Sequence, residues 1–222
     1  MDSEDNELKR YSYIDRDGNF DYRRYVAIQA DGNKRKINSQ WVDEASIAYL
    51  AKYILEHYGK PNFGICHGTR RGLEQLWFRK YLDCEVIGTE ISDSATQFAH
   101  TIQWDFHEIR PEWTNSVDFI YSNSWDHSYD PECLFNSWMS CLRPSGLCIV
   151  EHNRADRHIN ELDCLGMELP ELREFLVDLG QGRWELFDEI TGGPPVRTNS
   201  HKPERKGAQA MIAVSYLILR KF

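Results

Sequence analysis

Residues able to bind a charged ligand follow the first of several short apolar runs. That run ends in Phe63-Gly-Ile-Cys-His-Gly-Thr-Arg-Arg-Gly72, with glycines at 64, 68 and 72 before a predicted helix from Leu73. Glycine lets the backbone turn sharply and approach a ligand closely, and a helix N-terminus favours a negatively charged group such as a carboxylate. The segment therefore predicts an anion-accepting loop, of a kind that many α/β proteins carry.

Carboxylates stand at the ends of the next two runs. Val86-Ile-Gly-Thr-Glu90 places Glu90 where it can accept hydrogen bonds from two sugar hydroxyls. Gln103-Trp104-Asp105 offers an aromatic face and an acceptor for an adenine amine. We expect the three segments to bind one nucleoside-like ligand. The alternatives are a solvated Glu90, an Asp105 that caps the following turn, and a Trp104 in the core.

Two histidines and an aspartate follow the fourth and fifth runs. Asp126 and His127 come after Val117–Ser122, and His152 comes after Leu147–Glu151. A carboxylate next to an imidazole can orient it and raise its basicity, which suits a general base. Each histidine could equally be a hydrogen-bonded structural residue. These side chains and Asp130 are of metal-binding types but lack a dense metal-ligand spacing, so we predict no metal site.

The elements that position these residues are strands alternating with helices. The apolar runs are Phe63–Cys66, Glu85–Ile91, Thr101–Trp104, Val117–Ser122 and Leu147–Glu151. This alternation predicts a mostly parallel sheet with helices on both faces. The clearest helix start is Asp130-Pro131, where Asp can cap and Pro suits the first helical position. An amphipathic helix, Pro170–Leu179, and two antiparallel strands, Trp184–Ile190 and Met211–Arg220, are expected to follow.

Residues 1–60 are predicted to form an extension that packs on a domain spanning residues 61–222. Within it, Tyr25–Gln29 and Arg35–Asn38 flank Ala30-Asp-Gly-Asn-Lys34, a turn signal that favours a β-hairpin. Apolar residues then recur at helical spacing from Ile47 to Tyr58. Ser39 could cap that helix, and Gly59 followed by Pro61 would end it.

Composition limits the possible partners. The 222 residues, 41% of them hydrophobic, suffice for one sizeable core. A formal charge of −9 without a long basic run argues against a nucleic-acid partner. No stretch reaches membrane-spanning length and the first ten residues are polar, so we expect no membrane partner and a cytoplasmic location. The six cysteines lack CxxC spacing and are expected to be reduced and mostly buried. The sequence specifies no oligomeric state.

Residues 62–152 resemble the core of the class I S-adenosylmethionine-dependent methyltransferases, in particular those that act on small molecules. The resemblance covers roughly two-fifths of the chain and rests on the motifs above in their order. It rests further on Val117-Asp-Phe-Ile-Tyr-Ser-Asn-Ser-Trp-Asp-His-Ser-Tyr-Asp-Pro131 and Leu142-Arg-Pro-Ser-Gly-Leu-Cys-Ile-Val-Glu151. A Rossmann-like α/β fold is what this resemblance implies.

The resemblance also implies which residues hold the cofactor, S-adenosylmethionine. The expected cofactor-binding residues are Gly64, His67, Gly68 and Gly72 in the loop, Glu90 at the ribose, Trp104 and Asp105 at the adenine, and Asn123 beside the methionine portion. Some positions depart from the family pattern. His67 stands where an acidic or small residue is usual, Arg70 and Arg71 add charge to the loop, and Ser145 replaces a common glycine.

The expected reaction is methyl transfer by in-line displacement to a small-molecule acceptor, preferentially at oxygen. A hydroxyl acceptor would call for a general base, and the candidates are His127, Asp126 and His152. The segment 153–167 and the loop 191–207 are expected to cover the methyl group. A catalytically silent binding module is the alternative. A nicotinamide-dependent oxidoreductase is a weaker one, because the chain lacks Gly-x-Gly-x-x-Gly.

Overall fold

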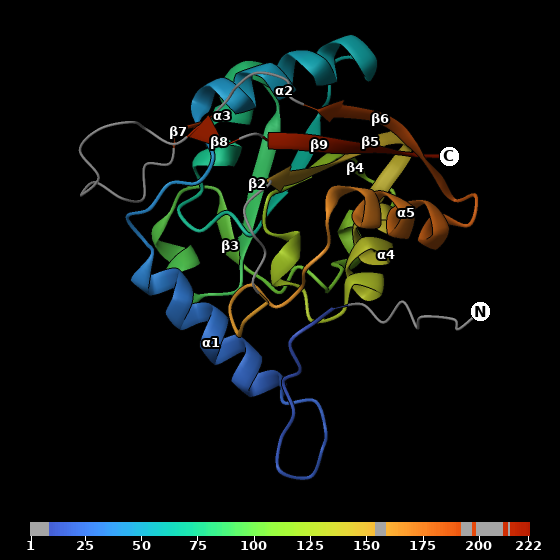
Figure 1. Ribbon diagram of the computed structural model, residues 1–222. Coiled ribbons are helices and arrows are strands. Elements are labelled where there is room, and N and C mark those ends of the chain that lie inside the picture. Colours follow the sequence, from blue (N-terminus) through green and yellow to red (C-terminus); the bar gives the residue numbers. More distant parts are fainter. Residues whose placement is uncertain (1–8, 154–158, 192–196, 199–210, 213) are drawn as a thin grey trace.

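The computed structural model describes residues 9–153, 159–191, 197–198, 211–212 and 214–222. Its centre is a seven-stranded sheet in the order β3-β2-β1-β4-β5-β9-β6 (Figure 1). The strands are β1 (Phe63–His67), β2 (Glu85–Glu90), β3 (Thr101–Gln103), β4 (Val117–Ser122), β5 (Leu142–Asn153), β6 (Trp184–Thr191) and β9 (Val214–Lys221). Strands β1 to β5 are parallel, and β9 is antiparallel to β5 and β6. A separate pair joins β7 (Arg197–Thr198) to β8 (Met211–Ile212). The predicted mostly parallel sheet with an antiparallel C-terminal pair is confirmed.

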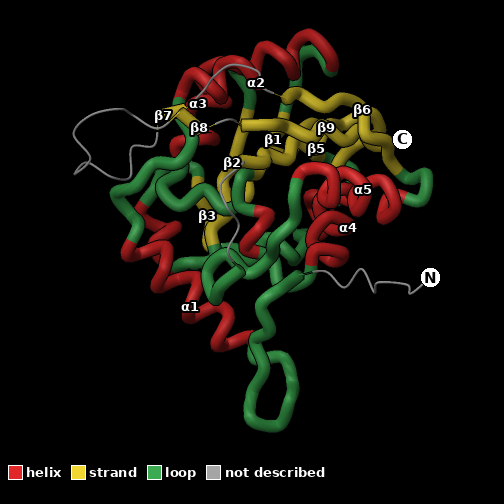
Figure 2. The backbone as a smooth tube through the Cα atoms, in the orientation of Figure 1, coloured by secondary structure: helices red, strands yellow, loops and turns green. Residues whose placement is uncertain are grey.

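Helices cover both faces of the sheet (Figure 2). Helices α2 (Glu44–His57) and α3 (Leu73–Leu82) pack on one face, and α4 (Pro131–Cys141) and α5 (Leu169–Gly180) pack on the other. Neighbouring residues of β4 divide between the two layers, because side chains alternate along a strand: Phe119 packs with α3 and Ile120 with α4. All six residues of β4 are buried, and the one charged residue among them, Asp118, accepts hydrogen bonds from the backbone N–H groups of Asn62 and Phe63.

Helices α4 and α2 both begin after a capping side chain, but the residue that caps α2 differs from the one predicted. Asp130 caps α4, its side chain accepting a hydrogen bond from the Cys133 N–H at 3.0 Å, as predicted. Helix α2 begins at Glu44 and is capped by Asp43, which accepts from the Ser46 N–H at 2.8 Å. Ser39 is therefore not the cap; its carbonyl accepts instead from the Arg70 guanidinium.

The predicted β-hairpin at residues 25–38 is wrong, because this stretch forms helix α1 (Tyr22–Arg35). Gly32 had suggested a turn, yet it serves close packing: a Cβ at this position would overlap the Leu162 side chain. Tyr25, Gln29 and Gly32 are the buried residues of α1, and their spacing is helical. Tertiary contact along that face outweighs the local turn signal.

Helix α1 lies apart from the two helical layers and closes the edge of the sheet at which the parallel strands end (Figure 1). Its Lys34 forms an ion pair with Asp93, in the short helix η1 (Asp93–Gln97) after β2. The Tyr22 hydroxyl donates to Asp105, which follows β3. The division of the chain at residues 60 and 61 stays a prediction.

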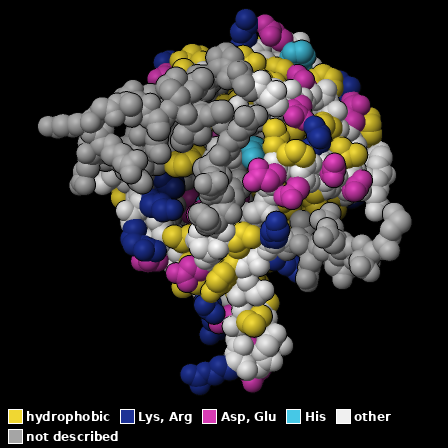
Figure 3. Space-filling view, viewed as in Figure 1, with side chains coloured by type: hydrophobic (Ala, Val, Ile, Leu, Met, Phe, Trp, Pro, Cys, Tyr) yellow, Lys and Arg dark blue, Asp and Glu magenta, His cyan; other side chains and the backbone are white. Residues whose placement is uncertain are grey.

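Charges of both signs are mixed on the face shown in Figure 3, where acidic and basic side chains alternate with hydrophobic ones. The six cysteines are free, and four of them, Cys66, Cys141, Cys148 and Cys164, are buried. Within the part of the chain that the structure describes, no helix is both long and apolar enough to cross a membrane.

Candidate functional site

Two adjoining cavities lie where the parallel strands end. The first, named here the Glu90 cavity, has a volume of about 70 Å³ and lies between α1 and the ends of β1 and β2. The second, the Asp163 cavity, has a volume of about 590 Å³, which suits a small molecule. The residues lining both are Lys36, Gly68, Arg70, Ser124 and His127. The two cavities therefore adjoin along these shared wall residues.

Of the three glycines of the predicted loop, Gly68 lines the described cavities. Its φ of +71° suits glycine, and a Cβ there would overlap Ser124 in the loop after β4. Gly64 lies within β1 against the Phe119 ring, and Gly72 precedes the first residue of α3. These two glycines permit packing around the loop, while Gly68 forms the cavity wall.

His67 lies in the core and lines neither described cavity. Its ring stacks on Trp138 at a centroid distance of 4.8 Å, and Nδ1 is 2.8 Å from the Thr89 hydroxyl. Burial lowers the pKa of His67 to about 3, so the ring is neutral at physiological pH. His67, the last residue of β1, therefore points into the α4 layer and away from the cavities, and its expected contact with the cofactor stays a prediction.

Glu90 stands at the cavity wall, as its place at the end of β2 predicts. One carboxylate oxygen accepts from the Arg70 N–H at 3.1 Å and the other from the Ser92 N–H at 3.0 Å. Burial raises the pKa of Glu90, and these backbone hydrogen bonds oppose the rise. A carboxylate held in this way is fixed in direction and can accept further hydrogen bonds from a ligand.

Trp104 and Phe106 line the Glu90 cavity, whereas Asp105, between them, does not. Its carboxylate accepts from the His107 N–H at 2.9 Å, lies 2.7 Å from His107 Nδ1, and accepts from the Tyr22 hydroxyl at 2.9 Å. Although burial opposes it, these contacts lower the pKa of Asp105. Asp105 thus belongs to a buried network that fixes the turn carrying both aromatic rings, and its expected contact with an adenine amine stays a prediction.

His152 is buried beneath the site. Its Nε2 donates to the Met167 carbonyl at 3.0 Å, its ring stacks on Trp125, and it lines neither described cavity. Of the two interpretations open from the sequence, the structural one fits this position. The predicted role as a general base does not, because the ring is 1% exposed and turned into the core.

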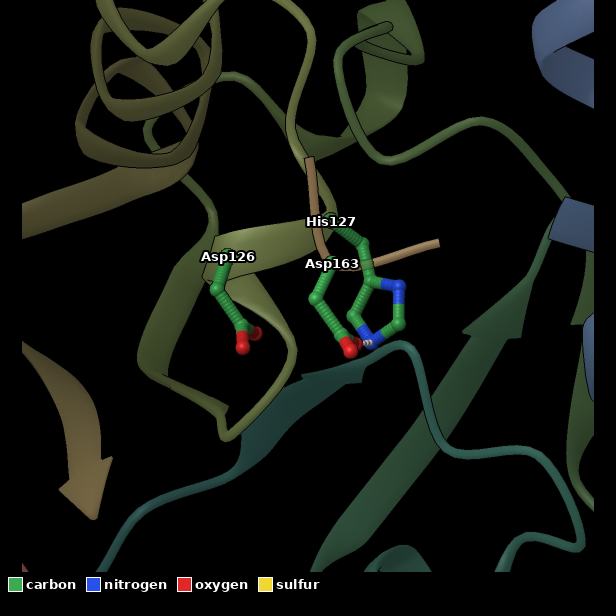
Figure 4. A group of neighbouring side chains, drawn as sticks. All are labelled: Asp126, His127 and Asp163. Atoms are coloured by element: carbon green, nitrogen blue, oxygen red, sulfur yellow. Dashed lines mark ion pairs between the residues drawn. The ribbon is translucent and has the colours of Figure 1, made fainter. Parts of the chain in front are cut away.

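Asp126 and His127 do lie at the Asp163 cavity, together with Asn123. They belong to the short helix η3 (Trp125–His127), and Asp163 approaches them from the segment before α5 (Figure 4). The His127 Nε2 is 3.7 Å from an Asp163 carboxylate oxygen. We name Asp126, His127 and Asp163 the Asp163 corner.

The Asp163 corner has the residue types of a metal site, since one possible ligand atom from each side chain lies within 4.8 Å of the others. Among the described residues it is the group that could hold an ion. The sequence groups Asp126 and His127 with Asp130 and His152 and predicts no metal site; in the structure Asp130 caps α4 and His152 is buried elsewhere. Asp163 was missed because it lies 36 positions after His127 in a segment without a motif.

Part of the segment 153–167 lies at the cavity wall, while its expected cover of the methyl group stays a prediction. Asn153, Ile159, Asn160 and Asp163 line the Asp163 cavity. In the loop expected at 191–207, residues 192–196 and 199–207 lie outside the described residues. Helix α1 contributes further wall residues that the sequence analysis missed, including Gln29; the helical spacing of residues 25, 29 and 32 was the available signal.

A family model described as a methyltransferase domain matches residues 65–150. No curated protein sequence matches the chain. The crystal structure of the 1,6-didemethyltoxoflavin N1-methyltransferase of Burkholderia thailandensis, with its substrate and S-adenosylhomocysteine bound, is similar over 99% of this chain and 98% of that one (TM-score 0.66, 15% identity). The plantazolicin methyltransferase BpumL, also with S-adenosylhomocysteine, is similar over 89% and 95% (TM-score 0.65, 15% identity).

The [4+2]-cyclase SpnF is similar in structure over 96% of this chain and 98% of its own (TM-score 0.59, 12% identity). At these identities the likeness to solved structures shows the fold, and the family model gives the assignment for residues 65–150. The matched residues contain most of β1, all of β2 to β4, the loop at Gly68 and Glu90, which form one side of the Glu90 cavity; the α1 residues on its other side lie outside the match. Residues 65–150 thus match a methyltransferase domain, and the chain has the Rossmann-like fold of solved methyltransferases that bind S-adenosylhomocysteine.

Proposed function

We propose that the protein binds S-adenosylmethionine along the two joined cavities and transfers its methyl group to a small acceptor in the Asp163 cavity. The observation that carries this proposal is that the two adjoining cavities share the wall residues Gly68, Arg70 and His127. The Glu90 cavity offers a fixed carboxylate between aromatic walls, and the Asp163 cavity offers space and polar groups. The groups that line the Glu90 cavity suit a ribose and an adenine, although its volume of about 70 Å³ requires the walls to open for a whole nucleoside, and the Asp163 cavity has room for an acceptor.

The cofactor-binding residues follow from the walls of the cavities. Glu90 would accept hydrogen bonds from the two ribose hydroxyls, and Trp104 and Phe106 would flank the adenine. Gly68 and Asn123 would border the methionine portion. Asp105 and His67 would support these walls without touching the ligand.

In the transfer itself, the sulfonium group of the cofactor supplies an activated methyl group. The protein must then position the acceptor in line, exclude water and receive a proton. We assign the oxygen of a hydroxyl as the acceptor atom and His127, beside the carboxylates of Asp126 and Asp163, as the group that takes its proton.

A nitrogen acceptor is the second candidate, because the Burkholderia thailandensis enzyme is named for transfer to a nitrogen. His127 could take the proton from either acceptor atom. Activity on matched hydroxyl and amine compounds distinguishes the two, and turnover of amines alone would contradict the assignment to oxygen.

Calorimetric titration tests the cofactor site directly. Wild-type protein is expected to bind S-adenosylhomocysteine and S-adenosylmethionine but not NAD. Glu90→Ala should weaken S-adenosylhomocysteine binding at least about tenfold, because charge-assisted hydrogen bonds contribute about 1.5–3 kcal/mol each. Glu85→Ala, at the exposed opposite end of β2, is the matched control and should bind as wild type does.

Three results of this titration would contradict the proposal. Unchanged affinity in a folded Glu90→Ala protein would exclude the ribose contact. Absence of nucleotide binding by the wild type would favour a silent module, and binding of NAD alone would favour the oxidoreductase. Binding of S-adenosylhomocysteine without methyl transfer to any acceptor would point to another chemistry on this fold, as the cyclase neighbour illustrates.

A further inference from the structure

One face of α1 holds the two segments of the Asp163 corner together. The Tyr25 hydroxyl donates to the backbone carbonyl of His127 at 3.1 Å. One turn further along, the Gln29 side chain lies between the His127 ring and the Leu162 backbone. Gly32, in the next turn, packs closely against the Leu162 side chain. The position of His127 relative to Asp163 therefore depends on α1.

The surroundings of Gln29 fix which way its amide points. The amide nitrogen lies 2.9 Å from the Leu162 carbonyl oxygen and 3.5 Å from the Glu161 carbonyl oxygen. Carbonyl oxygens only accept hydrogen bonds, so the nitrogen of the amide must face them. The amide oxygen consequently faces His127, at 2.9 Å from its Nδ1.

This orientation determines the tautomer of His127. An amide oxygen cannot donate, so Nδ1 must carry the hydrogen that joins the two groups. In the neutral ring, Nε2 then carries the lone pair. Figure 4 shows this nitrogen turned toward Asp163, whose carboxylate oxygen is 3.7 Å away, with Asp126 beside them. His127, Asp126 and Asp163 all line the Asp163 cavity.

We propose that Gln29 is a positioning residue, which holds His127 in the Nδ1–H tautomer so that Nε2 can take a proton from the acceptor. This role in the reaction rests on the proposed function; the tautomer does not. As the acceptor oxygen bonds the methyl carbon, its proton moves to Nε2, and the electron pair of the broken carbon–sulfur bond stays on sulfur. The resulting imidazolium donates from Nδ1 to Gln29 and carries its new hydrogen on the side of Asp163.

The tautomer can be read directly by long-range ¹H–¹⁵N NMR on protein labelled with ¹⁵N-histidine. The protein is studied without substrate, in the presence of a metal chelator, at a pH where the ring is neutral. The signals of His127 are those that disappear in His127→Phe. Wild type is expected to show a protonated Nδ1 and an unprotonated Nε2 for this residue.

Two substitutions separate positioning from general structural support. Gln29→Met keeps the side-chain length but removes the acceptor, so the Nδ1–H signature of His127 should be lost. Gln29→Glu keeps an acceptor oxygen toward Nδ1 but turns its second oxygen toward the Leu162 carbonyl, so it should retain the signature in a less stable protein. Gln97→Met is the control, because Gln97 is exposed in η1, away from His127, and the histidine signals should not change.

Two outcomes would overturn the inference: a protonated Nε2 in wild type, which needs no variant to observe, or an unchanged signature in Gln29→Met. Titration of wild type with S-adenosylhomocysteine is run separately. A normal His127 signature in protein that binds no S-adenosylhomocysteine would reject the proposed function while leaving the tautomer assignment intact. With an acceptor identified, Gln29→Met should lower kcat at least about tenfold, since a general base contributes about 10²–10⁴-fold, and Gln29→Glu should restore part of it.

Discussion

At the scale of single residues, His67 makes stability depend on pH without touching a ligand. Burial lowers its pKa to about 3, against an ordinary value of 6.5. Between these values the unfolded chain binds a proton that the folded protein does not, so stability falls as the pH drops below 6.5. One such group destabilises the fold by about 1.4 kcal/mol at a pH one unit below its ordinary pKa.

His67→Phe should remove this dependence while keeping an aromatic ring against Trp138. Unfolding in urea, measured at pH 7.5 and pH 5.5, should show wild type losing about 1.4 kcal/mol more than the variant between the two conditions. His57→Phe, at an exposed position, is the control and should follow wild type. Equal losses for His67→Phe and wild type would mean that the imidazole is charged or solvated in the fold.

At the scale of elements, α1 connects parts of the site that are distant in the sequence. Its residues contact η1, Asp105, η3 and Leu162, so one helix braces four segments around the cavities. Gly32 is the point of closest approach, because a Cβ there would meet Leu162. The docking of this helix should therefore depend on the combined volume of these two side chains.

Gly32→Val should destabilise the protein by about 1–3 kcal/mol, the usual cost of overpacking. In a Leu162→Ala background the same substitution should cost at least about 1 kcal/mol less, because the valine then occupies the vacated space. Urea unfolding of the four proteins in this double-mutant cycle measures the coupling. Additive effects would indicate that α1 docks without this contact.

At the scale of the whole molecule, ligand binding should stabilise the fold, because the cavities are built from segments throughout the chain. A ligand at 100 times its Kd stabilises a protein by about 2.7 kcal/mol. For a chain of this size, S-adenosylhomocysteine should then raise Tm by roughly 5–10 °C. NAD at the same concentration should not. Thermal unfolding followed by circular dichroism measures both, and an equal rise with NAD would contradict the assigned cofactor.

The sequence by itself determined the sheet, its order of elements and the position of Glu90. Apolar runs of strand length separated by helices leave few arrangements, and residues at the ends of parallel strands must meet at one edge. That reasoning placed Glu90, Trp104, Asn123, Asp126 and His127 at the cavities. These positions depend on strand ends, which local patterns mark well.

The tertiary structure decided the remaining features of the site. These features depend on the direction in which each side chain points and on contacts between segments distant in the sequence. His67 and Asp105 stand at the predicted strand ends, but His67 faces the core and Asp105 faces a buried network. Because side chains alternate along a strand, a shift of one residue reverses the side that a residue faces. Gly32 suggested a turn in the sequence, whereas in the structure it allows α1 to pack closely against Leu162. Asp163 and Gln29 carry no motif, and only the docking of α1 brings them to His127.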